Sequence, residues 1–200
     1  DFPYTRELGS EITYVCADSA PSPRRWAELA AAGRSFATSG PMLVATVDGR
    51  RPGEIFSLSS GADTTVTVGI SVRSPLYPLD CVEIVVDGWA RWRQRFDRPV
   101  ESAEFSRRVT IRGSSWLAVR ASGPAGTEAH TNPVYFYAGD NPPFNRDSAR
   151  RIIGRLEGSM ARVSSPDVRS RLGRAKLAVE ALLEGRPAGL PLPSPAREHR

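Results

Sequence analysis

Alternation of apolar and polar residues at a period of two constrains this chain more than any other feature. Within 64–72, Val66, Val68, Ile70 and Val72 alternate with threonine, glycine and serine. Successive side chains of a β-strand point to opposite faces of the sheet, so this pattern predicts a strand with one buried face. Similar runs recur roughly every ten residues, a spacing typical of β-sandwiches. The expected strands are 42–47, 55–58, 64–72, 82–86, 89–96, 105–111, 116–121 and 134–137.

Two Asp-Gly pairs follow apolar runs, at Asp48-Gly49 and at Asp87-Gly88. Type I′ turns require positive φ at both central residues, and Asp-Gly meets that requirement well. We therefore expect a β-hairpin at each pair. The predicted fold class is mainly β: an Ig-like or fibronectin-like antiparallel β-sandwich with a short N-terminal helix and a C-terminal αα-hairpin.

The helices are predicted from their end signals and from a change of period. Ser22 followed by Pro23 starts a short helix that Gly33 ends. Beyond residue 144 the apolar period becomes three and four, which predicts two further helices, the second running from Ser165 to Gly185. The expected organisation is a lead-in strand and helix from an upstream domain (1–40), a β-sandwich (41–140), a helical hairpin (141–185) and a Pro-rich flexible tail (186–200).

Side chains that carry catalysis are scarce. His130 and His199 are the only histidines, and the sequence contains no H-E-x-x-H, G-x-S-x-G, S-x-x-K, G-x-x-x-x-G-K or G-x-G-x-x-G motif. A catalytic zinc ion usually takes three protein ligands, with histidine prominent among them. We expect no catalytic residue, metal ligand or cofactor in this chain. Cys16 and Cys81 lie in apolar segments and are interpreted as small buried residues, with one disulfide between them as the alternative.

The basic charge is almost entirely arginine, a bias that codon usage explains most simply, since Lys176 is the only lysine. Residues 1–145 carry 15 basic and 16 acidic residues, whereas 146–200 carry 12 and 6. The helical arginines are interpreted as a solvated face, with an anionic surface as the alternative. The segment 89–96 interleaves aromatic residues with arginine, as in single-stranded nucleic-acid grooves, but a strand there would turn the aromatic rings inward. Nucleic acid is therefore a disfavoured partner.

Nine segments stand in a fixed order between residues 7 and 137: ELG (7–9), TYV (13–15), W (26), GRSFATSGP (33–41), VDG (47–49), PGE (52–54), VEIVVDG (82–88), SSWLAVR (114–120) and AHTNPVY (129–135). Together they resemble the C-terminal part of PHP-domain metallohydrolases of the carbaryl-hydrolase type, the CehA/McbA family. This chain departs from the family pattern at Ser39, where asparagine is expected, and at Asn132, where serine is commoner.

The resemblance implies a β-sandwich with trailing helices. It also implies that a metal-binding PHP domain, rich in histidine and aspartate, precedes Asp1 in the parent protein. That domain would hold the divalent metal and carry out the hydrolysis. This chain would then be a non-catalytic module that packs on the upstream catalytic domain of the same polypeptide and lines the mouth of its site.

The candidate domain-interface or site-mouth residues are His130, Thr131, Asn132, Ser39, Gly40 and Trp116. The alternative interpretation of His130 is a ring that satisfies the turn before the strand 134–137, and Trp116 fits either the core or an interface. The alternative function is a free-standing Ig-like module that binds a protein or a glycan through its strand-end loops.

Overall fold

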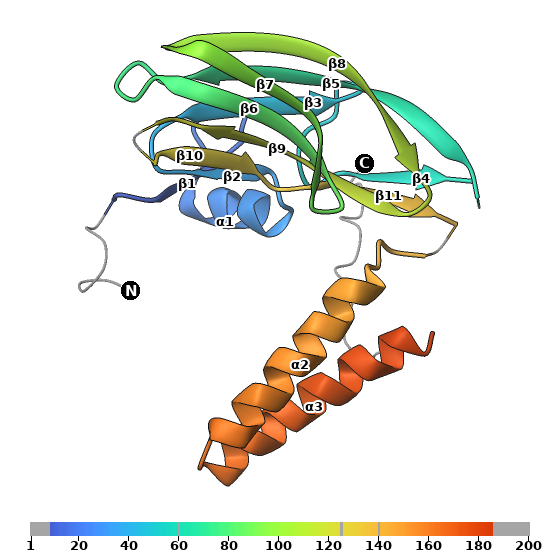
Figure 1. Cartoon of the computed structure of the whole chain (residues 1–200). Coiled ribbons are helices and arrows are strands. Elements are labelled where there is room, and N and C mark those ends of the chain that lie inside the picture. The colour runs from blue at the N-terminus through green and yellow to red at the C-terminus, as the bar shows by residue number, and fades with distance from the viewer. Residues whose placement is uncertain (1–8, 60, 125, 140, 186–200) are drawn as a thin grey trace. The chain divides into compact units, whose positions relative to one another are not determined.

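The structure is a computed structural model that describes residues 9–59, 61–124, 126–139 and 141–185 (Figure 1). The chain divides into two compact units, residues 1–143 and residues 144–200, and each is described by itself. The predicted Pro-rich tail, 186–200, and the start of the lead-in, 1–8, lie outside the described residues.

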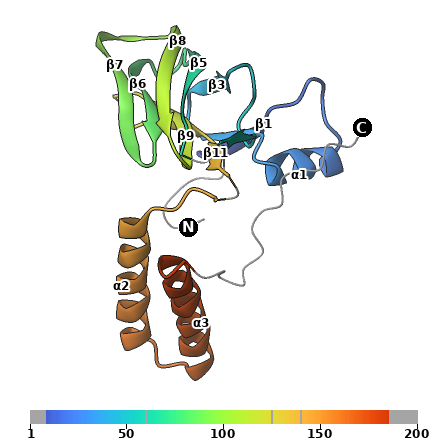
Figure 2. The ribbon, with the colours of Figure 1, turned by 90° about the vertical axis from the view of Figure 1, so that its right-hand side faces the viewer.

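The first unit contains two β-sheets, which can be followed in Figures 1 and 2. The smaller sheet has the order β3-β5-β8. In the larger sheet β6 lies between β7 and β9, and β9 pairs on its other side with β10 and then β11; β2 pairs with β10, β1 with β2, and β4 with β11. The strands are β1 (Ile12–Val15), β2 (Ser35–Thr38), β3 (Met42–Val47), β4 (Ile55–Leu58), β5 (Asp63–Arg73), β6 (Leu79–Val86), β7 (Trp89–Val100), β8 (Ser102–Arg112), β9 (Ser115–Ser122), β10 (Glu128–Thr131) and β11 (Val134–Ala138).

The core lies between the two sheets and is built from the alternating apolar residues that the sequence analysis identified. Val66, Val68, Ile70 and Val72 of β5 are all buried, and Ile84 of β6 lies in the same cluster. The neighbouring residues on each strand face outward. The predicted fold class is confirmed: the chain is mainly β, with two sheets, a short N-terminal helix and a C-terminal helical pair.

The two Asp-Gly turns have different outcomes. Asp87 and Gly88 have φ values of 52° and 86° and join β6 to β7 as the predicted hairpin. Asp48 also has positive φ, at 45°, and the predicted turn forms, since Val47 and Arg50 exchange two backbone hydrogen bonds, but the pairing ends there and does not continue into β4. The Asp48 carboxylate accepts the Thr67 N–H at 2.7 Å, so the end of β3 is bonded to β5. Strand β4 instead pairs with β11, and the two strands run parallel.

The strands β10 and β11 form one line along β9, interrupted at Asn132 and Pro133. The register against β9 shifts by one residue across this break, from Ala129 opposite Ala121 to Val134 opposite Leu117. Proline cannot donate a ladder hydrogen bond, which explains why the strand is interrupted there. On its other edge β10 pairs with β2 and β11 pairs with β4, so the interruption marks where the sheet changes partner.

The helices confirm the predicted end signals. Helix α1 (Pro23–Ala31) begins after Ser22, whose Oγ accepts the Arg25 N–H at 3.2 Å, and Gly33 follows with φ 73°. In the second unit α2 (Arg146–Arg162) and α3 (Pro166–Leu183) form an antiparallel pair. Among the described residues, no helix is both long and apolar enough to span a bilayer.

The two cysteines are both free and half-buried, rather than fully buried as interpreted from the sequence. Cys16 follows β1 and Cys81 lies in β6, and burial raises the pKa of each thiol. The disulfide that the sequence left open is not formed in this structure.

Candidate functional site

A row of polar side chains crosses the outer face of the larger sheet. Strand register places Arg93 opposite Glu83, Glu83 opposite Arg120, and Arg120 opposite His130. On the next strand, β2, the residue opposite His130 is Ala37, so the polar residues end at His130. Four neighbouring strands, β7, β6, β9 and β10, thus contribute the four polar members. We call Arg93, Glu83, Arg120 and His130 the polar row.

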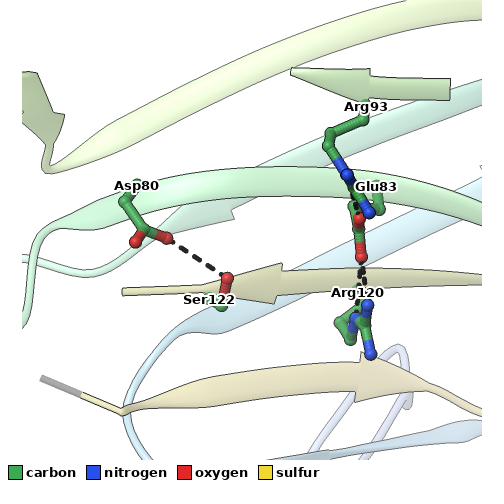
Figure 3. Close-up of polar contacts among 5 residues, drawn as sticks. All are labelled: Asp80, Glu83, Arg93, Arg120 and Ser122. Atoms are coloured by element: carbon green, nitrogen blue, oxygen red, sulfur yellow. Dashed lines mark hydrogen bonds and ion pairs between the residues drawn. The ribbon is translucent and has the colours of Figure 1, made fainter. Parts of the chain in front are cut away.

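Glu83 is the centre of the polar row and its most buried member. Its side chain is 6% exposed, whereas those of Arg93 and Arg120 are about half exposed. Figure 3 shows the Glu83 carboxylate between the two guanidinium groups. Arg120 Nε donates to Glu83 Oε2 at 2.9 Å, and Arg93 Nε donates to Oε1. One carboxylate therefore joins three adjacent strands by charged hydrogen bonds, the strongest kind that side chains make.

The ionisation of Glu83 depends on these partners. Burial acts to raise the pKa of Glu83, but the hydrogen bonds from Arg120 and Arg93 and the charges of both arginines outweigh it and hold the pKa below its usual range. The carboxylate is therefore charged at neutral pH.

Glu83 was not among the residues predicted for the site, although the sequence contains a signal for it. The residue interrupts the apolar run Cys81–Val86, where both flanking positions, Val82 and Ile84, are buried core residues. A carboxylate inside such a run must either lie on the outer face or be paired, and Glu83 is both. Its arginine partners come from β7 and β9, and only the strand register reveals them.

His130 and Ser39 meet at one shallow depression of about 260 Å³. His130 is exposed on β10, and its ring makes no hydrogen bond with the described residues, so it does not satisfy a turn. Ser39 Oγ accepts the Glu128 N–H at 3.0 Å. Two carboxylate residues, Glu11 and Glu128, also line the depression. The structure thus brings together two of the six candidate residues at the end of the polar row.

Thr131 and Asn132 have structural contacts in the sheet. Thr131 is buried, and its Oγ1 accepts the Val119 N–H at 3.1 Å where the β10–β11 line is interrupted. Asn132 Nδ2 donates to Ser35 Oγ at 2.7 Å, which fixes the interruption to β2. Gly40 lies apart from the depression's lining and leaves room for the Tyr77 ring, 3.2 Å from the place that a Cβ would occupy.

Trp116 lies on the same outer face as His130 but in a different row. It is half-buried and stands opposite Tyr135 of β11, while Leu117 beside it points into the core. Burial raises the pKa of the Tyr135 hydroxyl, and the nearby Tyr137 side chain raises it further by a smaller amount. Trp116 therefore belongs to the outer face and not to the core, and an aromatic pair accompanies the polar row on that face.

Three of the segments that carry the family resemblance converge in space. Gly53 lies against Gly33, and a Cβ on Gly33 would be 3.0 Å from Gly53 Cα. The Gly53 N–H donates to Pro133 O at 2.9 Å. Beside them Arg34 and Glu54 form a half-buried ion pair of 2.8 Å. Segments that begin near residues 33, 52 and 129 therefore form one cluster that ties the end of α1 to the sandwich.

No group of three or more histidine, cysteine, aspartate or glutamate side chains converges within the described ranges. The outer face of the larger sheet instead offers fixed charge, an exposed imidazole and an aromatic pair. Such a combination of ionic and apolar contact groups is suited to recognition of another surface.

Comparisons with known proteins show a likeness to solved structures only. No protein-family model and no curated protein matches the sequence. Fibronectin(III)-like modules of Clostridium thermocellum CbhA are similar to this chain in structure, with 14% sequence identity and a TM-score of 0.29, over 49% of this chain and 96% of that chain. The likeness concerns the fold alone. The two sheets of this chain form a β-sandwich, and a helical pair follows it in the sequence.

Proposed function

We propose that this chain is a non-catalytic accessory module that packs on the catalytic domain of a PHP-type metal-dependent hydrolase. The observation that carries the proposal is the outer face of the larger sheet, where the polar row lies beside the Trp116–Tyr135 pair. The contact would bring His130 to the mouth of the neighbouring site. The divalent metal and its ligands would belong to the upstream domain.

The attachment of the lead-in supports the same function. Strand β1 pairs with β2 along four residue pairs, from Ile12 opposite Thr38 to Val15 opposite Ser35. The Gly33–Gly53 contact and the Arg34–Glu54 ion pair fix the end of α1 to the sandwich. An upstream domain joined through β1 would be held close to the larger sheet and would have little freedom to move away from it.

The alternative function, a free-standing module that binds a protein or glycan, is favoured by one feature. The β5–β6 loop exposes Leu76 and Tyr77, which are 82% and 46% exposed, at an end of the sandwich where strand-end loops gather. Exposed apolar loop residues commonly mark contact sites for other proteins. This alternative needs no upstream domain.

The experiment that tests the first proposal is expression of the complete reading frame that encodes this chain. We expect a histidine- and aspartate-rich domain upstream, stoichiometric divalent metal in the full-length product, and ester hydrolysis that the 200-residue chain alone does not perform. A start codon or secretory signal directly before Asp1 would overturn the proposal and favour the free-standing module. Tight metal binding and hydrolysis by the isolated chain would overturn it as well.

A further inference from the structure

Positive charge is concentrated on two neighbouring edge strands of the sandwich. Segment 89–112, which contains β7 and β8, carries seven arginines and three carboxylates, although residues 1–145 as a whole are almost neutral. Among the described strands β7 pairs only with β6, and β8 pairs only with β5. Each strand therefore leaves one backbone edge free. The register places Arg95 on the outer face of the larger sheet and Arg108 on the outer face of the smaller sheet, so arginines flank the two free edges from both sides. The two strands run one after the other in the chain and are joined at Glu101.

Most of these arginines have no acidic partner. Arg93 pairs with Glu83, and Arg112 pairs weakly with Asp63 at 3.7 Å. Within the described part of the chain, no carboxylate lies within ion-pair distance of the other five. We define these five as the arginine edge: Arg91, Arg95, Arg98, Arg107 and Arg108.

Apart from Trp89, the aromatic residues of the same strands are turned away from solvent. Trp92 and Phe105 are half-buried against the core, with ring centroids 4.9 Å apart. The Arg107 guanidinium covers Trp92 at 5.1 Å from its ring centroid. A single-stranded nucleic acid needs aromatic rings open to its bases, and these rings are closed. The arginine edge therefore carries positive charge but lacks a row of exposed aromatic rings on which bases could stack.

One aromatic ring on β7 remains open. Trp89, the first residue of β7, is 69% exposed. A strand of this length extends for roughly 40 Å, and arginine suits carboxylate or sulfate groups because its planar fork binds two oxygens at once. We propose that the arginine edge binds a linear acidic polysaccharide, whose acidic groups contact the guanidinium groups and one of whose sugar rings stacks on Trp89.

The test compares two triple variants of the full chain in binding a heparin fragment long enough to span β7. The first variant, Arg91→Ser with Arg95→Ser and Arg108→Ser, removes three members of the arginine edge. The matched control, Arg151→Ser with Arg155→Ser and Arg174→Ser, removes the same charge from the helical pair. We expect the first variant to bind about tenfold more weakly or worse, with a shallower salt dependence, and the control to change less than twofold.

Two further measurements keep the test decisive if a variant folds poorly. In the wild-type chain, heparin should shift the backbone NMR signals of β7 and β8 and leave those of α2 and α3 in place. The substitution Trp89→Ala should weaken binding severalfold while the unfolding midpoint stays unchanged.

Three outcomes would overturn the proposal. Equal losses in the two triple variants would mean that overall charge drives binding. Tighter binding of an oligothymidine of the same length would mean that the partner is a nucleic acid. Aggregation of the first variant with heparin affinity intact would mean that the arginines only protect the strand edges from pairing with other chains.

Discussion

Gly53 lies directly against the backbone that follows α1, and a Cβ on Gly53 would stand 2.1 Å from Ala32 O. Gly53 also has φ 88°, in the left-handed region that other residues avoid. We predict that Gly53→Ala destabilises the sandwich by about 3 kcal/mol or more, from the backbone clash and the unfavourable φ together.

Gly49→Ala is the matched control for this prediction. Gly49 has a similar φ, 78°, but nothing lies within 4 Å of its added Cβ, so the expected loss is only about 1–2 kcal/mol. Tryptophan fluorescence during denaturant unfolding measures both variants, because all four tryptophans precede residue 144 and report on the first unit alone. Equal losses would contradict the close contact between Gly53 and the end of α1.

Glu83→Gln removes the charge that joins Arg93 and Arg120. The two guanidinium groups would lose their ionic partner, and we predict a loss of about 1–3 kcal/mol in the free energy of unfolding. Glu104 is exposed on β8, makes no ion pair with the described residues and accepts only a long hydrogen bond from Ser71 Oγ, at 3.5 Å, so Glu104→Gln should change stability by about 0.5 kcal/mol or less. An equally small effect of Glu83→Gln would mean that the buried pair does not stabilise the sheet.

The stability of the sandwich should also depend on pH through Glu83. Because the folded-state pKa of Glu83 is lowered, its contribution is present in full above the unfolded-state pKa of about 4.3 and is lost as the pH falls through the folded-state value. The stability difference between the wild-type chain and Glu83→Gln should therefore shrink on acidification below about pH 4. Unfolding curves at a series of pH values measure it, and a constant difference would contradict the ionised state of Glu83.

Thr131→Val tests how much the hydrogen bond at the strand interruption contributes to stability. Valine has nearly the same shape but cannot accept the Val119 N–H, so we expect a loss of about 1–2 kcal/mol and faster amide exchange at Val119. Thr131→Ser retains the hydroxyl and should preserve slow exchange at that amide. Slow exchange in Thr131→Val would indicate that burial, rather than the hydroxyl, protects this position.

The sequence predicted the long strands well because their alternation is local. The run around Val68 and the Asp87-Gly88 turn each contain their own signal within a few residues. The strands β2 and β10 were not among the expected strands, since their stability comes from pairing with distant segments rather than from a local pattern.

The candidate site was predictable only in part, for the same reason. His130 and Trp116 could be singled out as polar and aromatic residues near strands, and the structure places both on the outer face. The residues beside them could not be predicted, because Glu83 and its two arginines come from different strands and only the strand register brings them together. Thr131 looked like an interface residue in the sequence but is buried and bonded to β9.

Site-specific photo-crosslinking in the full-length polypeptide tests the central claim most directly. A photoreactive residue in place of His130 probes the polar row, and one in place of Thr67, exposed on the outer face of β5, serves as the control. Docking through the larger sheet predicts crosslinks from position 130 to an upstream catalytic domain and few or none from position 67. Crosslinks from position 67 alone, or none to an upstream domain from position 130, would contradict it.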